Sequence, residues 1–398
     1  MSVAEEFSRT RFDALETAIT DGDAEHVRKL AASAQMEYVP VHDGLRDTVG
    51  AALSYAVDMT SPEEGEAIGR RAIARIMAGG DAPQYGQIDL RARIRAIAAG
   101  WHWHVTGFTV VEDEDKVTFR LAPCGSGMRL ETEGRYDGAQ GWHRSVAPSP
   151  STFMQRGFPL YSNHCAEMTR AGLISGSGAF LVEGWTPERN RGACFQHTFK
   201  RMEAVPAEFY RRVGLEPPSP VETTPVVQLF SELELVDLAT HPLDRAATAV
   251  ESGDTDAALA ALAESREAWG TAMHGAYLRW IAELWEEICR VCGEREREPL
   301  LEATAPELFG HIRGGDAHSW ASFWSMHLAL RGISEGPDGA TTFEVEPAAL
   351  LSDVSLVTPE ILCRCVRRGA EGRCWPAIGH IESDGVTIRH TVDMTQQS

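Results

Sequence analysis

A repeated order of motifs constrains this chain of 398 residues more than any other feature. The break Asp21-Gly22-Asp23 between two helical patterns returns as Gly253-Asp254. The run Trp101-His-Trp-His104 returns as Trp324-Ser-Met-His327, and Thr118-Phe-Arg-Leu-Ala-Pro returns as Thr342-Phe-Glu-Val-Glu-Pro. Because the matches keep one order and the gaps fall at turns, they predict an internal duplication of one structural unit.

The duplication predicts an α+β fold of two similar units. Each unit begins with helices and continues into an antiparallel sheet with a cysteine-containing turn region. Prolines at 217, 218 and 220 make residues 215–224 the best linker. We therefore predict a first unit over 1–214, the linker over 215–224, and a second unit over 225–398.

Local patterns support this order of elements. Apolar residues at three- and four-residue steps predict helices over 12–31, with a break at Gly22, and a further helix around His42. Pro62 is placed to begin the next helix, and residues 88–103 form another candidate. Alternating residues over 104–111 and 116–121, around the acidic turn 112–115, predict an antiparallel hairpin. A helix starting at Cys165 and a strand over 179–185 follow.

The charge of the chain excludes several classes of partner. A formal net charge of −21 argues against nucleic acids and anionic membranes, which bind clustered cations. No apolar run reaches the roughly 18 residues of a membrane helix, and the first residues lack the pattern of a secretory signal. We expect a cytoplasmic protein, and in that compartment the eight cysteines are reduced thiols or metal ligands.

The stretch from Arg120 to Lys200 collects residues that commonly bind metals. Cys124 lies between a proline and Gly-Ser-Gly, so a strand ending there would present a thiolate from a turn rich in backbone amides. Three thiolates and one histidine suit tetrahedral zinc. We predict a zinc site, with iron as the second choice, formed by Cys124, Cys165, Cys194 and His164.

Ser126, His143 and His197 are the predicted catalytic residues. An open position on the metal would activate water or hold a substrate thiol beside Ser126, and one of the histidines would move protons. The fourth ligand stays open among His164, His143 and His197. Also open are a structural role of the metal, a reactive Cys124 thiol without metal, and cysteines that only fill the core. The second copy has Ala348 in place of Cys124, which assigns the chemistry to the first copy.

Other motifs receive structural interpretations. If residues 101–104 form a strand, His102 and His104 lie on one face and could act together. We favour the alternative in which Trp101 and Trp103 belong to the core and the two histidines are capped or exposed. The pair His42-Asp43 lacks the additional ligands of a helical phosphohydrolase. The Cys289-x-x-Cys292 pair lies in a helical pattern without a second pair, so we interpret it as core. The run 175–178 has the wrong spacing for a nucleophile elbow.

Three runs resemble known families. These are Cys165-Ala-Glu-Met-Thr-Arg-Ala-Gly-Leu, Ala179-Phe-Leu-Val-Glu-Gly-Trp and Asn190-Arg-Gly-Ala-Cys194-Phe. They resemble the closing half of 4-vinyl-reductase-type ligand-binding domains and are similar to 2-amino-thiazoline-4-carboxylate hydrolase-like bacterial proteins. The resemblance implies a small-molecule pocket between helices and an antiparallel sheet, with metal or thiol at its rim. Bacterial proteins of similar layout are expected to have a cysteine at Ser162, which puts the fourth ligand in doubt.

The leading functional hypothesis is a metal-dependent hydrolase or lyase. Its substrate would be a small organic molecule containing sulfur or nitrogen. The alternative is a non-catalytic protein that binds or senses a small molecule and contains a structural zinc. In either case we expect the protein to bind neither nucleic acid nor a membrane. A homodimer formed through the second unit stays an open alternative.

Overall fold

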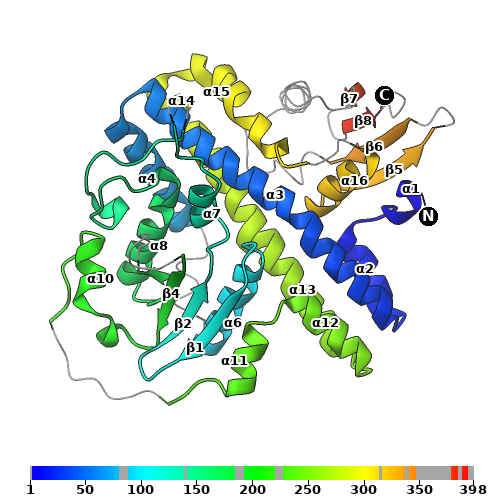
Figure 1. The fold of residues 1–398 in the computed structure, drawn as a ribbon, viewed down its shortest axis with the longest axis horizontal. Helices are drawn as coiled ribbons and strands as arrows, with labels where there is room; N and C mark the ends of the chain where they lie inside the picture. The colour runs from blue at the N-terminus through cyan, green and yellow to red at the C-terminus, as the bar shows by residue number, and fades with distance from the viewer. Residues whose placement is uncertain are drawn as a thin grey trace. The chain divides into compact units, whose positions relative to one another are not determined.

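The computed structural model describes residues 2–79, 88–138, 141–183, 192–219, 227–312, 316–336, 340–346, 378–383 and 388–392. The chain divides into two compact units, each described by itself below (Figure 1). Unit 1 comprises Met1–Ala52, Pro242–Cys289 and Gly293–Ser398, and unit 2 comprises Leu53–His241 and Arg290–Cys292. This division differs from the predicted boundaries, because the first 52 residues group with the last part of the chain. Residues 220–224 of the predicted linker lie outside the described residues.

Unit 2 combines helices with one antiparallel sheet. The strands are β1 (Phe108–Glu112), β2 (Lys116–Leu121), β3 (Leu181–Val182) and β4 (Cys194–Phe199), in the order β1-β2-β4-β3. After the end of α3, its helices are α4 (Pro62–Gly79), α6 (Leu90–His102), α7 (Gly127–Thr132), α8 (Asn163–Ile174), α10 (Ala207–Arg212) and α11 (Glu232–Leu238). Short 3-10 turns lie at Pro150–Thr152, Leu160–Ser162 and Met202–Ala204.

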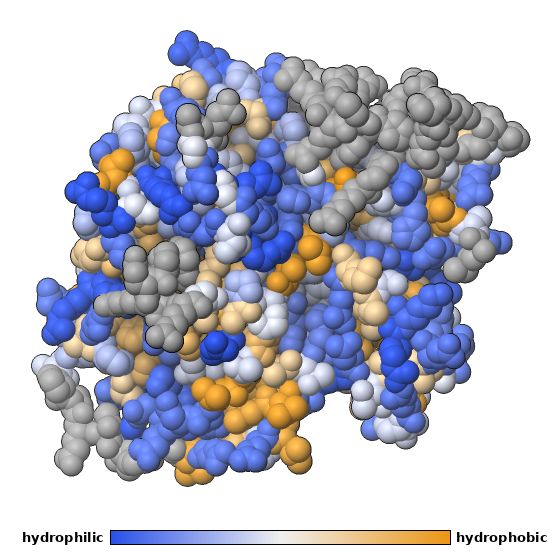
Figure 2. Space-filling model, viewed as in Figure 1, coloured by the Kyte–Doolittle hydropathy of each residue, from blue (hydrophilic) through white to orange (hydrophobic). Residues whose placement is uncertain are grey.

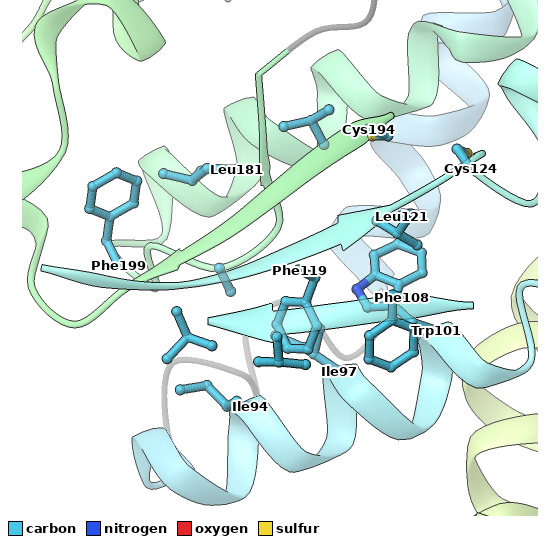
Figure 3. Close-up of a cluster of buried hydrophobic side chains, with 14 of the residues drawn as sticks. Ile94, Ile97, Trp101, Phe108, Phe119, Leu121, Cys124, Leu181, Cys194 and Phe199 are labelled. Atoms are coloured by element: carbon cyan, nitrogen blue, oxygen red, sulfur yellow. The ribbon is translucent and has the colours of Figure 1, made fainter. Parts of the chain in front are cut away.

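The core of unit 2 lies between α6 and the sheet. Asp89 caps α6 by accepting hydrogen bonds from the backbone N–H groups of the first turn. Ile94, Ile97 and Trp101 then recur at helical spacing and face the sheet (Figure 3). Full burial of one such side chain contributes roughly 1.5–3 kcal/mol. The same core cluster contains Cys124 and Cys194, so this packing also fixes one end of the sheet.

Unit 1 has a sheet of the same strand order. Its strands are β5 (Leu330–Glu335), β6 (Thr341–Val345), β7 (Ile378–Ser383) and β8 (Ile388–Val392), in the antiparallel order β5-β6-β8-β7. Its helices are α1 (Val3–Glu6), α2 (Arg11–Thr20), most of α3 (Ala24–Met59), α12 (Pro242–Glu251), α13 (Thr255–Glu267), the π-helix Ala268–Gly275, α14 (Ala276–Cys292), α15 (Arg297–Thr304) and α16 (Ala317–Met326). Two 3-10 turns lie at Glu294–Glu296 and Ala305–Phe309.

The predicted α+β fold is confirmed, with helices and antiparallel sheets in both units. The shared strand order agrees with a duplication, which stays a prediction. The cysteines of the second copy, Cys363, Cys365 and Cys374, lie outside the described residues, as does Ala348.

The helical breaks were predicted correctly, but one helix was divided in error. Gly22 has a positive φ of 71° between α2 and α3, and Gly253 has a φ of 79° between α12 and α13. Residues 24–59, predicted as separate helices, form the single 36-residue helix α3 with Pro40 inside it. Proline removes one backbone donor but does not always end a helix, and here the apolar pattern continues on both sides.

The surface of the described residues is largely polar, with local apolar areas (Figure 2). One apolar area lies over α11 and β1, where Leu233 and Val236 are exposed on the helix and Val111 on the strand. None of the helices in the described part of the chain combines the length and the apolar composition that a membrane crossing requires.

Candidate active site

The site lies at one end of the sheet of unit 2. Strand β2 ends at Leu121, and the chain turns through Cys124 before α7 begins (Figure 3). Cys194 is the first residue of β4 and pairs with Leu121, so both cysteines lie at the same end of the sheet.

His104 joins this turn from the end of α6. Its Nε2 lies 2.9 Å from Oγ of Ser126, within a hydrogen bond, and 3.9 Å from Sγ of Cys124. Oγ of Ser126 also lies 3.7 Å from Sγ of Cys124. All three side chains are buried, at 5%, 1% and 7% exposure for His104, Ser126 and Cys124. A hydroxyl and a thiol therefore share one imidazole in a site away from solvent.

Close backbone packing holds this contact in place. Val105, directly after His104, has a φ of 51°, a conformation that a β-branched residue rarely adopts. A Cβ at Gly125 would lie 1.3 Å from the carbonyl oxygen of His104. Only glycine at this position lets the cysteine-containing turn approach the end of α6.

We expect Gly125→Ala to separate His104 from Ser126, because the added methyl group cannot avoid the His104 carbonyl. Overpacking of this kind destabilises a protein by about 1–3 kcal/mol. Urea unfolding measures the loss, and the NMR signals of the His104 ring report the broken contact. Gly107→Ala is the matched control, since nothing lies within 4 Å of a Cβ there. Equal stability of both variants would contradict the role given to Gly125.

A second pair of histidine and thiol lies at the start of α8. Nδ1 of His164 donates a hydrogen bond of 2.6 Å to the carbonyl oxygen of Tyr161, which places the ring proton on Nδ1. Nε2 then faces Sγ of Cys165 at 3.4 Å with its lone pair. Burial lowers the pKa of His164 to about 4; the hydrogen bond to Tyr161 opposes this decrease, and the charge of His104 adds to it. At neutral pH the ring is uncharged, so Nε2 can accept a hydrogen bond or bind a metal.

The three thiols are close enough to influence one another. Burial raises the pKa of Cys165, and the charge of a Cys124 thiolate adds to this increase. Burial also raises the pKa of Cys194 well above its usual value. The charges of Cys124 and Cys165 contribute smaller increases. Three segments far apart in sequence thus bring their thiols into one neighbourhood.

The thiols are not arranged as a metal shell. Within the described ranges, no group of three or more cysteine, histidine or acidic side chains has an arrangement that could hold a metal ion. The donor types suit zinc, and the contact of His164 with the Tyr161 carbonyl is one that metal-bound histidines usually make. The chemistry of the set fits a metal, whereas its geometry here does not.

The other predicted catalytic residues lie elsewhere in unit 2. Nε2 of His143 contacts Oδ1 of Asp58 at 2.7 Å, and its backbone N–H donates to Ser54. His197 lies between Thr118 and Glu183, at 3.0 Å from each. Because side chains alternate along a strand, His197 points to the opposite face of β4 from Cys194. The structure does not bring these two histidines to the cysteines.

His104 is the site residue that the structural interpretation of the sequence missed. The favoured interpretation of the sequence had His102 and His104 capped or exposed. It agrees with His102, whose Nε2 contacts the carbonyl oxygen of Leu238 at 3.0 Å. The interpretation is wrong for His104, which is buried and contacts Ser126. Helix α6 ends at His102, and the turn that follows directs His104 toward Ser126.

Comparison of the chain with protein-family models, curated proteins and solved structures finds no match. The resemblance to 4-vinyl-reductase-type and 2-amino-thiazoline-4-carboxylate hydrolase-like proteins therefore stays a prediction.

Proposed function

We propose that unit 2 is the catalytic unit of an enzyme that acts on a small organic molecule by hydrolysis or elimination. The observation that carries this proposal is the buried contact of His104 with Ser126, at 2.9 Å, beside Cys124. A nucleophile within hydrogen-bond distance of a base is the arrangement that activated hydroxyls and thiols require. The proposal also places the protein in the cytoplasm, where such thiols stay reduced.

His104 is the proton-transfer group of the proposed reaction. Its Nε2 can accept the proton of the Ser126 hydroxyl as that oxygen attacks the substrate, or the proton of a water or substrate carbon next to it. The protonated ring then returns the proton to the leaving group. Burial of the pair strengthens the electrostatic interactions of these steps, because little water screens them.

We further propose that Cys124, Cys165 and Cys194, with His164 as the fourth ligand, bind zinc, with iron as the second choice. Support comes from the neighbouring thiols and from the orientation of His164 by the Tyr161 carbonyl. If zinc binds these residues, it would supply Lewis acidity to a substrate oxygen or to water. The proton transfers by His104 do not depend on it.

The experiment compares wild type with Ser126→Ala, His104→Gln and Cys124→Ala in a screen of small esters, amides and elimination substrates. Loss of the base lowers turnover roughly 10²–10⁴-fold. Elemental analysis of untagged protein tests the metal separately, with Cys165→Ala added and Cys289→Ala as control, since Cys289 is a buried cysteine of unit 1.

The outcomes separate the two proposals. About one zinc per chain, lost in Cys124→Ala and Cys165→Ala but kept in Cys289→Ala, supports the metal site. If the wild type contains no metal and its turnover is lost in His104→Gln, the result supports a thiol or hydroxyl nucleophile instead. Turnover that survives His104→Gln would refute the assignment of the base.

A non-catalytic binding protein is the second candidate function. The observation that favours it is the low exposure of the site, where Ser126 is 1% exposed. A protein of this class would bind its ligand tightly, show no turnover in the screen, and keep its ligand affinity in Ser126→Ala.

A further inference from the structure

Two buried polar side chains lie in the apolar layer between α6 and the sheet of unit 2. Gln196 on β4 pairs with Phe119 on β2, and its neighbour on that face of the strand, Cys194, pairs with Leu121. Opposite residues of antiparallel strands point to the same face, so Gln196 shares the face of these core residues. Trp101 on α6 packs in the same core cluster. Gln196 is 4% exposed and Trp101 is 7% exposed.

Each of these side chains has a polar atom without a partner. Among the residues that the structure describes, neither Nε1 of Trp101 nor Oε1 of Gln196 makes a hydrogen bond. A buried polar group without a partner destabilises a protein by about 1–3 kcal/mol, and such groups are rare in native proteins. One of the two atoms is a donor and the other is an acceptor.

Both side chains contact the candidate active site. The ring of Trp101 lies 5.3 Å from the ring of His104, measured between centroids. Nε2 of Gln196 donates to Sγ of Cys194 at 3.9 Å. The two side chains therefore lie beside the base and one of the thiols.

We propose that the substrate of this site is a neutral small molecule with an amide-type group, such as a carboxamide, a lactam or a urea. The inference deepens the proposed function and rests on it. The carbonyl oxygen of such a group accepts from the Trp101 indole, and its N–H donates to Gln196. One group that contains an acceptor next to a donor satisfies both buried atoms, and its neutrality avoids the large penalty for a buried unpaired charge.

The reaction that follows is hydrolysis of the amide-type bond. The carbonyl carbon gains a bond to the oxygen of water and loses its bond to nitrogen, and one proton of water passes to the leaving amine. His104 provides the proton transfer. Water is the second reactant, and no oxidant or reductant takes part.

Benzamide and acetophenone are matched probes, because only benzamide has the N–H donor. Titration followed in ¹H–¹⁵N spectra of the indole groups gives both dissociation constants, with the Trp101 signal assigned among ten tryptophans by its loss in Trp101→Phe. We expect benzamide to bind wild type about tenfold more tightly than acetophenone, as one good hydrogen bond allows. Gln196→Met keeps the length of the side chain and should remove this difference.

Three results separate this inference from the proposed function. Selective benzamide binding in wild type and in Ser126→Ala, lost in Gln196→Met, supports the inference whether or not turnover is found. Equal binding of the two probes, or binding that leaves the Trp101 indole signal unmoved, would overturn it. Turnover of substrates without an amide-type group, with no affinity for benzamide, would overturn it while the proposed function stands.

Discussion

Lys200→Met is expected to destabilise unit 2 by about 3–5 kcal/mol, because it leaves the Glu112 carboxylate buried without its cation. Nζ of Lys200 lies 2.6 Å from Oε1 of Glu112, and both side chains are only 1% exposed. Glu112 also accepts backbone hydrogen bonds from Leu229 and Phe230. The ion pair thus joins the end of β1 to the residue after β4 and to the segment before α11.

Lys116→Met is the matched control for this result. Lys116 pairs with Asp113 at 2.7 Å, but the two side chains are 28% and 53% exposed, and such pairs contribute roughly 0–1 kcal/mol. Hydrogen exchange in urea, followed at amides of β1 and β4, reports the stability of unit 2 alone. Similar losses of unfolding free energy in the two variants would show that the buried pair stabilises unit 2 no more than the exposed pair does. The double variant Glu112→Gln with Lys200→Met should recover part of the stability.

Acidification is expected to destabilise unit 1 through two buried histidines. Nε2 of His274 lies 2.7 Å from Nδ1 of His327, and both rings are buried. Burial lowers the pKa of His274 from its usual 6.5 to about 3. Burial and then the charge of His274 lower the pKa of His327 well below its usual value. The folded state therefore keeps both rings neutral at a pH where the unfolded chain binds protons.

The stability contributed by the neutral pair is present above about pH 6.5 and is lost progressively as the pH falls toward 3. Well below pH 6.5 each histidine accounts for about 1.4 kcal/mol per pH unit, so the two together remove roughly 3 kcal/mol between pH 6.5 and 5. Urea unfolding at a series of pH values, followed by exchange at amides of α16 and β5, measures this slope. His274→Gln should lower the slope of unfolding free energy against pH by the amount that corresponds to about one bound proton. An unchanged slope in that variant would refute the assignment.

Most local elements could be predicted because their signals lie in neighbouring residues. The α6 pattern of Ile94, Ile97 and Trp101 indicates a helix from spacing alone, and Asp89 lies where the cap belongs. The acidic turn before Lys116 marked the hairpin of β1 and β2 for the same reason. In α3 two helical patterns were separated in error, since tertiary packing decides whether a helix continues through a residue such as Pro40.

The cysteines of the site and the neighbour of Cys165, His164, could be predicted, whereas the contact of His104 with Ser126 and Cys124 could not. Cys124, Cys165 and Cys194 were recognised from residue type and turn context. Which histidine reaches them depends on where α6 ends and on how closely Gly125 lets two turns approach. His197 is only three residues from Cys194 in sequence, but strand alternation directs its ring to the other face.

The discontinuity of unit 1 has a consequence for the order of folding during synthesis. Residues 1–52 leave the ribosome first, but the rest of their compact unit begins only at Pro242. Nearly all of unit 2 is encoded between these segments, so its core is complete while α2 still lacks α12 and α13. Because domains generally fold as units, the nascent chain exposes the apolar face of its N-terminal helices for roughly 190 residues of elongation, about 10–40 seconds at typical rates. We expect this segment to bind chaperones during that interval.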